Sequence, residues 1–284
     1  MKARSGWSDS YGYTESICYD LINHLVNDIM VMGARPLAVL DTIIGARAEK
    51  ETLKTLVKSM VDACRENGCT LVGGETSIQP GLVEDGRYIL SASIAGIADR
   101  DRIVDGSRIE AGDRMLAVAS NGLHTNGYSL VRLLLEKYPA LLREKVAGEP
   151  FLDVVMRPHR SYYHAFLALQ KISGVHGMAH ITGGGVAGNV IRILPEGCQA
   201  VIDLEKIRVP QVFDLIRRTG NVPEADMLDT FNLGVGLVLV VAADCQAQVE
   251  AALRQVEYDS FPIGQVVAGA KEVELCGSVD WEGW

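Results

Sequence analysis

The segment from Ser120 to Arg132, SNGLHTNGYSLVR, constrains the fold of this chain more than any other stretch. The apolar run from Arg114 to Ala119 before it predicts a buried strand, and the apolar-periodic run from Tyr128 to Tyr138 after it predicts a helix. Glycines in a turn between a strand and a helix let backbone N–H groups approach an anion closely. The turn therefore favours a phosphate site, although a tight turn with a helix cap would give the same local pattern. The residues of interest in this turn are Gly122, His124, Thr125, Asn126 and Gly127.

Composition limits the class of protein. The chain has 284 residues, 48% of them hydrophobic and 22% charged, with a net charge of -9. This predicts one large or two medium folded domains and excludes a disordered chain. An acidic chain without a run of Lys or Arg argues against nucleic-acid binding. No apolar run of about 18 residues and no signal peptide occur, so we expect no membrane span and a cytoplasmic location.

The six cysteines are scattered, and none forms a CxxC pair. This spacing predicts free thiols in a reducing compartment and argues against a structural cysteine zinc site.

Hydrophobic periodicity predicts a mixed α/β chain in two halves, divided near residues 105 to 112. We expect domains at residues 1–108 and 109–284. Helices are expected at residues 15–32, 51–67, 128–138, 161–172, 186–194, 210–219 and 244–255. Strands are expected at residues 37–44, 69–72, 88–97, 114–119, 199–202 and 236–242.

The first predicted helix carries polar residues at a helical spacing. Asp20 and Asn27 are seven residues apart and share a face, and Asp28 lies beside that face. Carboxylate oxygens gathered near a ligand suit Mg²⁺, but a solvated helix face has the same pattern. His24 is interpreted as a packing or hydrogen-bonding residue rather than as a metal ligand.

Glu75 and Thr76 follow a short predicted strand and two glycines. The carboxyl end of a buried strand is where α/β proteins place active groups, so Glu75 is a candidate ligand-binding residue. The alternative is that Glu75 starts a tight turn.

Two further glycine-rich segments precede or follow predicted strands. Gly183, Gly184 and Gly185 stand before a helix, which predicts an anion-binding nest, with a flexible connector as the alternative. His180 and Thr182 are expected on one face of the strand before them. Asn232 lies in FNLGVG, where close backbone approach and a β-bulge are equally good readings.

No Walker A loop, GxSxG elbow or HExxH motif occurs in the chain. Six stretches instead resemble, in order, the aminoimidazole ribonucleotide synthetases, also called phosphoribosylformylglycinamidine cyclo-ligases. These are YDLINHLVNDIMVMGARPLAVLD, LVGGETSIQPG, IVDGSRIEAGD, SNGLHTNGYSLVR, HITGGGVAGNVIRILP and TFNLGVG. Single motifs are shared with thiamine-monophosphate kinase, selenophosphate synthetase, a hydrogenase maturation protein and formylglycinamidine ribonucleotide synthetase, but the combination of LVGGET, HTNGYSLVR and HITGGG is specific.

The resemblance implies a two-domain fold in which the amino-terminal sheet joins that of a second copy in a barrel-like dimer core. It implies ATP and Mg²⁺ as cofactors and a small nucleotide, formylglycinamidine ribonucleotide, as the substrate. ATP would phosphorylate the formyl amide oxygen, a nitrogen would attack that carbon, and phosphate would leave as the imidazole closes in purine biosynthesis. Alignment of reactants and neutralisation of charge are then the protein's task.

The resemblance also implies roles for residues that match the family motifs. His180 and His124 are expected to be catalytic, with His180 handling a proton or stabilising charge. The residues expected to bind ATP or its phosphates are Asn27, Glu75, Thr76, Gly122, Asn126 and Gly127. The residues expected to bind substrate are Thr125, Thr182, Gly183, Gly184, Gly185 and Asn232. The expected metal ligands are Asp20, Asp28 and Glu75.

The sequence departs from the family pattern in two places. The family carries an upstream GTDGVGTK-like phosphate loop, and Met1 and Lys2 stand about where that loop ends, so we expect this form to be weakly active or inactive. The segment from Val186 to Asn189 is less bulky than its family counterpart. The alternative functions are a related small-molecule kinase, such as one acting on thiamine monophosphate, or an inactive form that dimerises or binds nucleotide.

Overall fold

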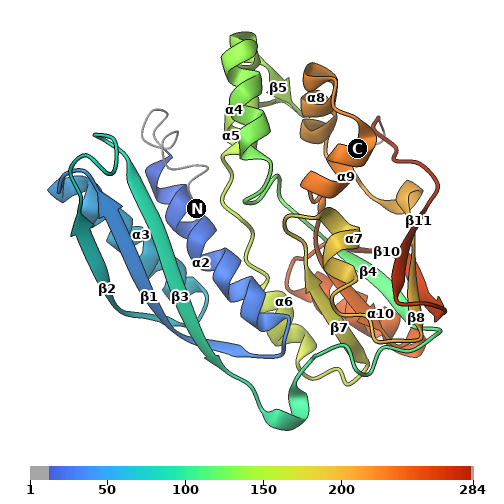
Figure 1. The fold of residues 1–284 in the computed structure, drawn as a ribbon. Coiled ribbons are helices and arrows are strands. Elements are labelled where there is room, and N and C mark those ends of the chain that lie inside the picture. Colours follow the sequence, from blue (N-terminus) through green and yellow to red (C-terminus); the bar gives the residue numbers. More distant parts are fainter. Residues whose placement is uncertain (1–12, 283–284) are drawn as a thin grey trace.

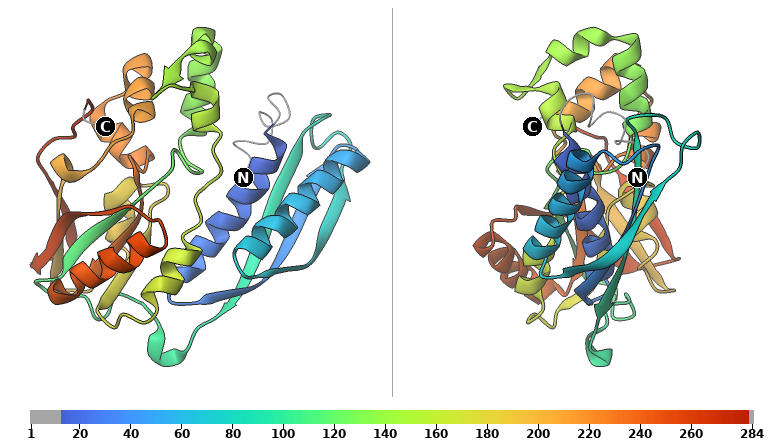
Figure 2. Two further views of the ribbon diagram at one scale, coloured as in Figure 1. Left: turned by 180° about the vertical axis from the view of Figure 1, so that it is seen from behind. Right: turned by 90° about the vertical axis from the view of Figure 1, so that its left-hand side faces the viewer.

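The computed structural model describes residues 13–282, so the expectation for Met1 and Lys2 lies outside the described residues. The first half contains a small mixed sheet with strand order β2-β1-β3, in which β1 is parallel to β2 and antiparallel to β3. Helices α2 and α3 lie on the same side of this sheet (Figures 1 and 2). The elements of this half are α2 (Thr14–Met30), β1 (Arg35–Gly45), α3 (Lys50–Glu66), β2 (Thr70–Ile78) and β3 (Tyr88–Ile97).

The second half is built on a larger sheet with strand order β11-β8-β10-β4-β9-β7, in which every neighbouring pair except β11 and β8 is antiparallel. Its strands are β4 (Arg114–Ala119), β7 (Val175–His180), β8 (Cys198–Asp203), β9 (Val235–Val241), β10 (Ser260–Ala268) and β11 (Glu272–Cys276). A short hairpin of β5 (Lys145–Val146) and β6 (Glu149–Pro150) stands apart from it. The helices are α4 (Tyr128–Lys137), α5 (Phe151–Val155), α6 (Tyr163–Leu169), α7 (Gly185–Val190), α8 (Gln211–Gly220), α9 (Glu224–Thr230) and α10 (Gln246–Gln255). Single 3₁₀ turns lie at Arg100–Arg102, Pro139–Arg143, Leu204–Lys206 and Ala243–Cys245.

Strand β4 shows how the two halves share a core. Met115 and Ala117 point to a core covered by α4, α5 and α8, whereas Leu116 and Val118 point to the opposite face. That second core also contains buried residues of α2, β1 and α3. Burial on both faces explains why β4 reads as a continuous apolar run. Helix α2 therefore lies between the small sheet and the second half (Figure 1).

The predicted mixed α/β class and most predicted elements of the chain are confirmed. The prediction of a strand at residues 69–72 that opens into a loop is wrong. Strand β2 continues to Ile78, and Glu75 and Thr76 pair with β1. Two consecutive glycines are typical of a loop, but here they let β2 approach β1 closely. A Cβ on Gly74 would lie 2.1 Å from the Asp41 carboxylate.

Gly127 is required by packing at the start of α4. Its φ is +80°, and an added Cβ would lie 2.0 Å from the ring of Phe231. We expect Gly127→Ala to lower the free energy of unfolding by about 2 to 4 kcal/mol, measured by chemical denaturation. Gly148 is the matched control, because its φ is +88° and no atom lies within 4 Å of an added Cβ. Gly148→Ala should cost about 1 kcal/mol, and equal losses for the two variants would contradict the packing argument.

Candidate functional site

The polar face of α2 contacts the backbone that precedes α6. The buried Asp20 accepts a hydrogen bond from the His159 N–H at 2.7 Å through Oδ1. Asn23 donates from Nδ2 to the His159 carbonyl oxygen, also at 2.7 Å. Asp20 and Asn27 therefore share a face of α2 as predicted, and this face contacts the backbone of the segment before α6. Asp20 as a metal ligand stays a prediction, and its carboxylate is already engaged.

Asn27 continues the same contact one turn later. Its Nδ2 donates to the Arg160 carbonyl oxygen at 2.9 Å, and its Oδ1 accepts from the Tyr162 N–H at 2.9 Å. Only 1% of Asn27 is exposed, so these bonds satisfy a buried amide. A phosphate-binding role for Asn27 stays a prediction.

The turn between β4 and α4 places two histidine rings in contact. His124 is buried and has a positive φ of 57°. Its ring stacks on the ring of His159 with centroids 4.0 Å apart. The Tyr128 hydroxyl, also buried, lies 3.0 Å from the His124 carbonyl oxygen. The turn is therefore fixed by Tyr128, the first residue of α4, and by His159, which lies in the segment that α2 contacts.

His180 lies at the end of β7 and faces α2. Its Nδ1 is 2.7 Å from Oδ1 of Asp28, whose Oδ2 is 3.3 Å from Nε2 of His24. Partial burial acts to raise the pKa of Asp28, but the bonds from His180 and His24 outweigh it and hold that pKa below its usual range. Burial lowers the pKa of His180 despite the opposing effect of Asp28. The pair is therefore a carboxylate bonded to a neutral imidazole.

His159 completes a cluster of histidines at the boundary of the two halves. Its Nε2 lies 3.0 Å from Nε2 of His180, and its Nδ1 lies 3.5 Å from Oγ1 of Thr125. Thr125 Oγ1 is also 3.1 Å from Nδ1 of His24. His159 was missed by the sequence analysis, because it lies outside helices and strands and belongs to no motif. His24 makes hydrogen bonds, as predicted.

The glycine triplet already uses two of its backbone N–H groups within the chain, and the predicted anion nest stays a prediction. The N–H groups of Gly184 and Gly185 already donate to the carbonyl oxygens of Asp229 and Thr182. Helix α7 that follows has only six residues. Gly183 lies against Asn126, since a Cβ added to it would be 3.3 Å from Oδ1 of that residue. The two predicted loops are therefore neighbours, and substrate binding by Thr182 to Gly185 stays a prediction.

Asn232 joins two of the predicted segments. Its Nδ2 donates to the Gly122 carbonyl oxygen at 2.9 Å, while its Oδ1 accepts from the Ser120 hydroxyl and from the Gly234 N–H. Only 2% of Asn232 is exposed. These bonds fix the start of the turn that carries His124, and a substrate-binding role for Asn232 stays a prediction.

Glu75 and Thr76 are not brought to the histidine cluster within one chain. Glu75 is paired with Thr42 on β1 and is exposed, as is the neighbouring Leu40. Cross-strand partners share a face, and the residues next to Thr42, Asp41 and Ile43, are buried beneath the helices. Glu75 therefore lies on the face of the small sheet opposite α2.

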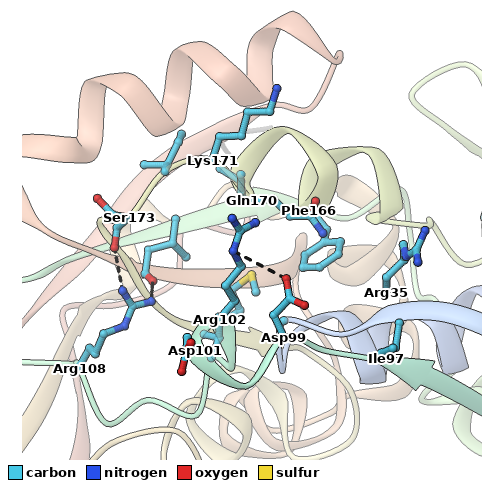
Figure 3. Close-up of a pocket in the computed structure, with 16 residues that line it drawn as sticks. Arg35, Ile97, Asp99, Asp101, Arg102, Arg108, Phe166, Gln170, Lys171 and Ser173 are labelled. Atoms are coloured by element: carbon cyan, nitrogen blue, oxygen red, sulfur yellow. Dashed lines mark hydrogen bonds and ion pairs between the residues drawn. The ribbon is translucent and has the colours of Figure 1, made fainter.

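A cavity of about 820 Å³ lies away from these residues, beside the linker that leaves β3 (Figure 3). Its basic lining residues are Arg35, Arg102, Arg108 and Lys171. Arg108 donates to the carbonyl oxygens of Ser173 and Val175, and Arg102 is 3.9 Å from Asp99. None of the residues predicted to bind ATP, substrate or metal lines this cavity.

Comparison with known proteins identifies the family. Residues 8–98 match the AIR synthase related protein, N-terminal domain, and residues 110–276 match the C-terminal domain of the same description. The chain belongs to the AIR synthase related family. It is 42% identical over 264 residues to a phosphoribosylformylglycinamidine cyclo-ligase from Anaeromyxobacter dehalogenans, covering 92% of this chain and 76% of that protein. A cyclo-ligase from Methylobacillus flagellatus is 41% identical over 261 residues, covering 92% and 75%.

Solved structures support the fold of this family member. The thiamine-monophosphate kinase of Stenotrophomonas maltophilia has a TM-score of 0.69 at 16% identity, covering 94% of this chain and 80% of that chain. The hydrogenase maturation protein HypE of E. coli has a TM-score of 0.68 at 25% identity, covering 92% and 77%. The recognition of the cyclo-ligase family from its motifs is confirmed by the family models and the curated relatives.

Asn27 gives a test of the contact between the two halves. Asn27→Ala leaves the Arg160 carbonyl and the Tyr162 N–H without this partner, so we expect the free energy of unfolding to fall by about 2 to 4 kcal/mol. The control is Gln79→Ala, which removes an exposed amide and should change stability by less than about 0.5 kcal/mol. Unchanged stability with weakened ATP binding would instead assign Asn27 to the ligand.

Proposed function

We propose that this chain catalyses the ATP-dependent cyclisation of formylglycinamidine ribonucleotide to aminoimidazole ribonucleotide. ATP phosphorylates the formyl amide oxygen, a substrate nitrogen attacks the activated carbon, and phosphate leaves. The relatives at about 42% identity are cyclo-ligases, which supports this reaction over that of the kinases that share the fold. The products are aminoimidazole ribonucleotide, ADP and phosphate.

The observation that carries the proposal is the meeting of three distant family motifs at one place. Asp28 comes from α2, His124 and Thr125 from the turn before α4, and His180 from the end of β7. Residues more than 150 positions apart therefore face one another, at 2.7 Å between His180 and Asp28. Such convergence of polar groups is typical of a ligand site.

His180 is proposed as the proton-handling residue. Its Nδ1 is bonded to Asp28, so Nε2, which faces His159, carries the lone pair of the neutral ring and is the proposed acceptor of the proton that the reaction releases. Asp28 fixes this tautomer and stabilises the imidazolium that forms. His124 is proposed as a second catalytic group, because its ring stacks on His159 beside this pair.

ATP and Mg²⁺ are proposed as the cofactors. A HypE structure with a TM-score of 0.66 at 20% identity holds ATP, covering 91% of this chain and 75% of that chain. Mg²⁺ prefers carboxylate oxygens with free coordination sites, and the Asp28 side chain is 47% exposed. Asp28 therefore fits this ion better than the buried Asp20 does. Gly122, Asn126 and Gly127 are proposed to approach the phosphates from the neighbouring turn.

Replacement of His180 tests the reaction. We expect His180→Asn to lower kcat for substrate-dependent ADP formation by about 100-fold to 1,000-fold, because the proton acceptor is lost. The exposed His164→Gln on α6 is the control and should leave kcat unchanged. The assay is run on the wild-type chain and on both variants with ATP and Mg²⁺.

Two results would reject the cyclo-ligase proposal. One is the absence of ADP formation by the wild-type chain with formylglycinamidine ribonucleotide, ATP and Mg²⁺. The other is turnover of thiamine monophosphate in its place, which would make the protein a kinase.

A homodimer is proposed through the open face of the small sheet. Leu40 and Val72 are 55% and 58% exposed on adjacent strands, and Ile97 is 54% exposed at the end of β3. Apolar side chains on an uncovered sheet mark an interaction surface. A second copy of the chain is proposed to cover this face, on which Glu75 also lies.

A charge on this face tests the dimer. We expect Leu40→Glu to convert a dimer to a monomer in analytical ultracentrifugation, because burying a carboxylate in an apolar interface is costly. Leu133→Glu is the control, since Leu133 is 57% exposed on α4 in the other half. A wild-type monomer at all concentrations would contradict the proposal.

The remaining proposals concern location and partners. Within residues 13–282, no helix has both the length and the apolar character that a membrane crossing needs. A cytoplasmic location stays a prediction from the purine-pathway reaction. The net charge of -9 supports a small-molecule enzyme rather than a nucleic-acid binder.

A further inference from the structure

Two of the six cysteines meet where α3 ends, although the sequence contains no CxxC pair. Cys64 lies in the last turn of α3, and Cys69 directly precedes β2. Both are buried, with 1% and 8% of their surface exposed. The Cys69 N–H donates to the Cys64 carbonyl oxygen at 3.0 Å, and the Cys69 thiol lies 3.5 Å from the same oxygen. The backbone therefore holds the two residues side by side.

The turn between the two cysteines is a Schellman motif. Besides the bond from Cys69 to Cys64, the Gly68 N–H donates to the Arg65 carbonyl oxygen at 3.2 Å, and Gly68 has a positive φ of 64°. In this motif the side chains at the positions of Cys64 and Cys69 pack against each other. The contact between the thiols is thus a consequence of how α3 ends.

Contacts on both sides fix this turn in the folded chain. Asn67 donates from Nδ2 to Oδ1 of Asn23 on α2 at 2.7 Å, and its own Oδ1 accepts from the Ser161 hydroxyl. Gly68 lies against α6, since an added Cβ would be 2.3 Å from the Tyr163 hydroxyl oxygen. The two thiols are therefore kept together and are shielded from large reagents and from the thiols of other proteins.

The two thiols also interact directly, and this contact separates their acidities. It lowers the pKa of Cys69, against the opposing effect of burial. The same contact and burial both raise the pKa of Cys64. A thiolate is the form of cysteine that reacts with oxidants. Cys69 is therefore the more reactive of the two, and it is also the more exposed.

We propose that Cys64 and Cys69 form a redox-active dithiol that hydrogen peroxide converts to an intramolecular disulfide. The Cys69 thiolate attacks one peroxide oxygen, the O–O bond breaks, and a sulfenic acid forms as hydroxide leaves. The Cys64 sulfur then attacks the Cys69 sulfur, and the S–O bond breaks. The Cys64 proton passes to the departing hydroxyl group, which leaves as water. Two thiols are oxidised to one disulfide, and one peroxide is reduced to two molecules of water.

Peptide mapping without reductant tests the disulfide. The reduced full chain is treated with hydrogen peroxide until the partly exposed Cys276 is oxidised, blocked with N-ethylmaleimide and digested with trypsin. Trypsin cuts after Arg65, between the two cysteines, so the disulfide appears as peptide 59–65 linked to peptide 66–87. We expect this linked pair in the wild-type chain and its loss after treatment with dithiothreitol.

Cys64→Ser removes the thiol that closes the disulfide. We expect no linked pair in this variant and at least about 10-fold more sulfinic acid at Cys69 than in the wild-type chain, because the sulfenic acid has no neighbouring thiol to condense with. Cys64→Ala is a second variant with the same expected result, and circular dichroism checks that both fold. Cys276→Ser is the matched control, since it removes a cysteine of β11 and should leave the linked pair unchanged.

Two results would overturn the proposal. One is a wild-type chain in which Cys276 is oxidised and no linked pair of peptides 59–65 and 66–87 forms. The other is an equal amount of sulfinic acid at Cys69 in the wild-type chain and in both Cys64 variants. Either result leaves the cyclo-ligase proposal intact, because the mapping uses neither ATP nor substrate.

Discussion

The contact between α2 and the backbone of residues 159–162 is the constraint on which the rest of the structure depends. The buried side chains of Asp20, Asn23 and Asn27 bind this backbone through four hydrogen bonds of 2.7 to 2.9 Å. Polar side chains buried without partners would cost about 1 to 3 kcal/mol each. The segment before α6 therefore has to follow α2, and the small sheet is attached to the second half through this helix.

Two polar stripes on α2 serve different purposes. Asp20, Asn23 and Asn27 point to the segment before α6 and hold it. His24 and Asp28, one turn apart, lie beside this stripe and face His180 across the boundary. Because both stripes belong to one rigid helix, the geometry of the reactive cluster is set by the structural hydrogen bonds next to it. This arrangement is typical of sites in which neighbouring bonds fix the reacting groups.

The sequence predicted those parts of the site whose residues follow a period or stand in a motif. The shared face of Asp20 and Asn27, the turn that carries His124, and the candidacy of Asp28 and His180 were accessible in this way, whereas the direct contact between Asp28 and His180 was not predicted. His159 was not, because it lies in irregular backbone and is brought to the cluster only by the contact with α2. Glu75 was misplaced because its two glycines read as a loop, whereas pairing with β1 decides that they form a strand.

The turns that contain Gly127 and Gly185 show why a local sequence pattern predicts the backbone shape of a site but not its chemistry. Gly127 is required by the Phe231 ring, and Gly185 by the Leu228 carbonyl, which would lie 1.7 Å from an added Cβ. These requirements are internal to the fold and would exist without a ligand. The N–H groups of Gly184 and Gly185 are likewise used by the chain itself. Glycine clustering therefore reports close backbone approach, and only the facing side chains of Asp28, Thr125 and the histidines indicate which ligand chemistry the site can serve.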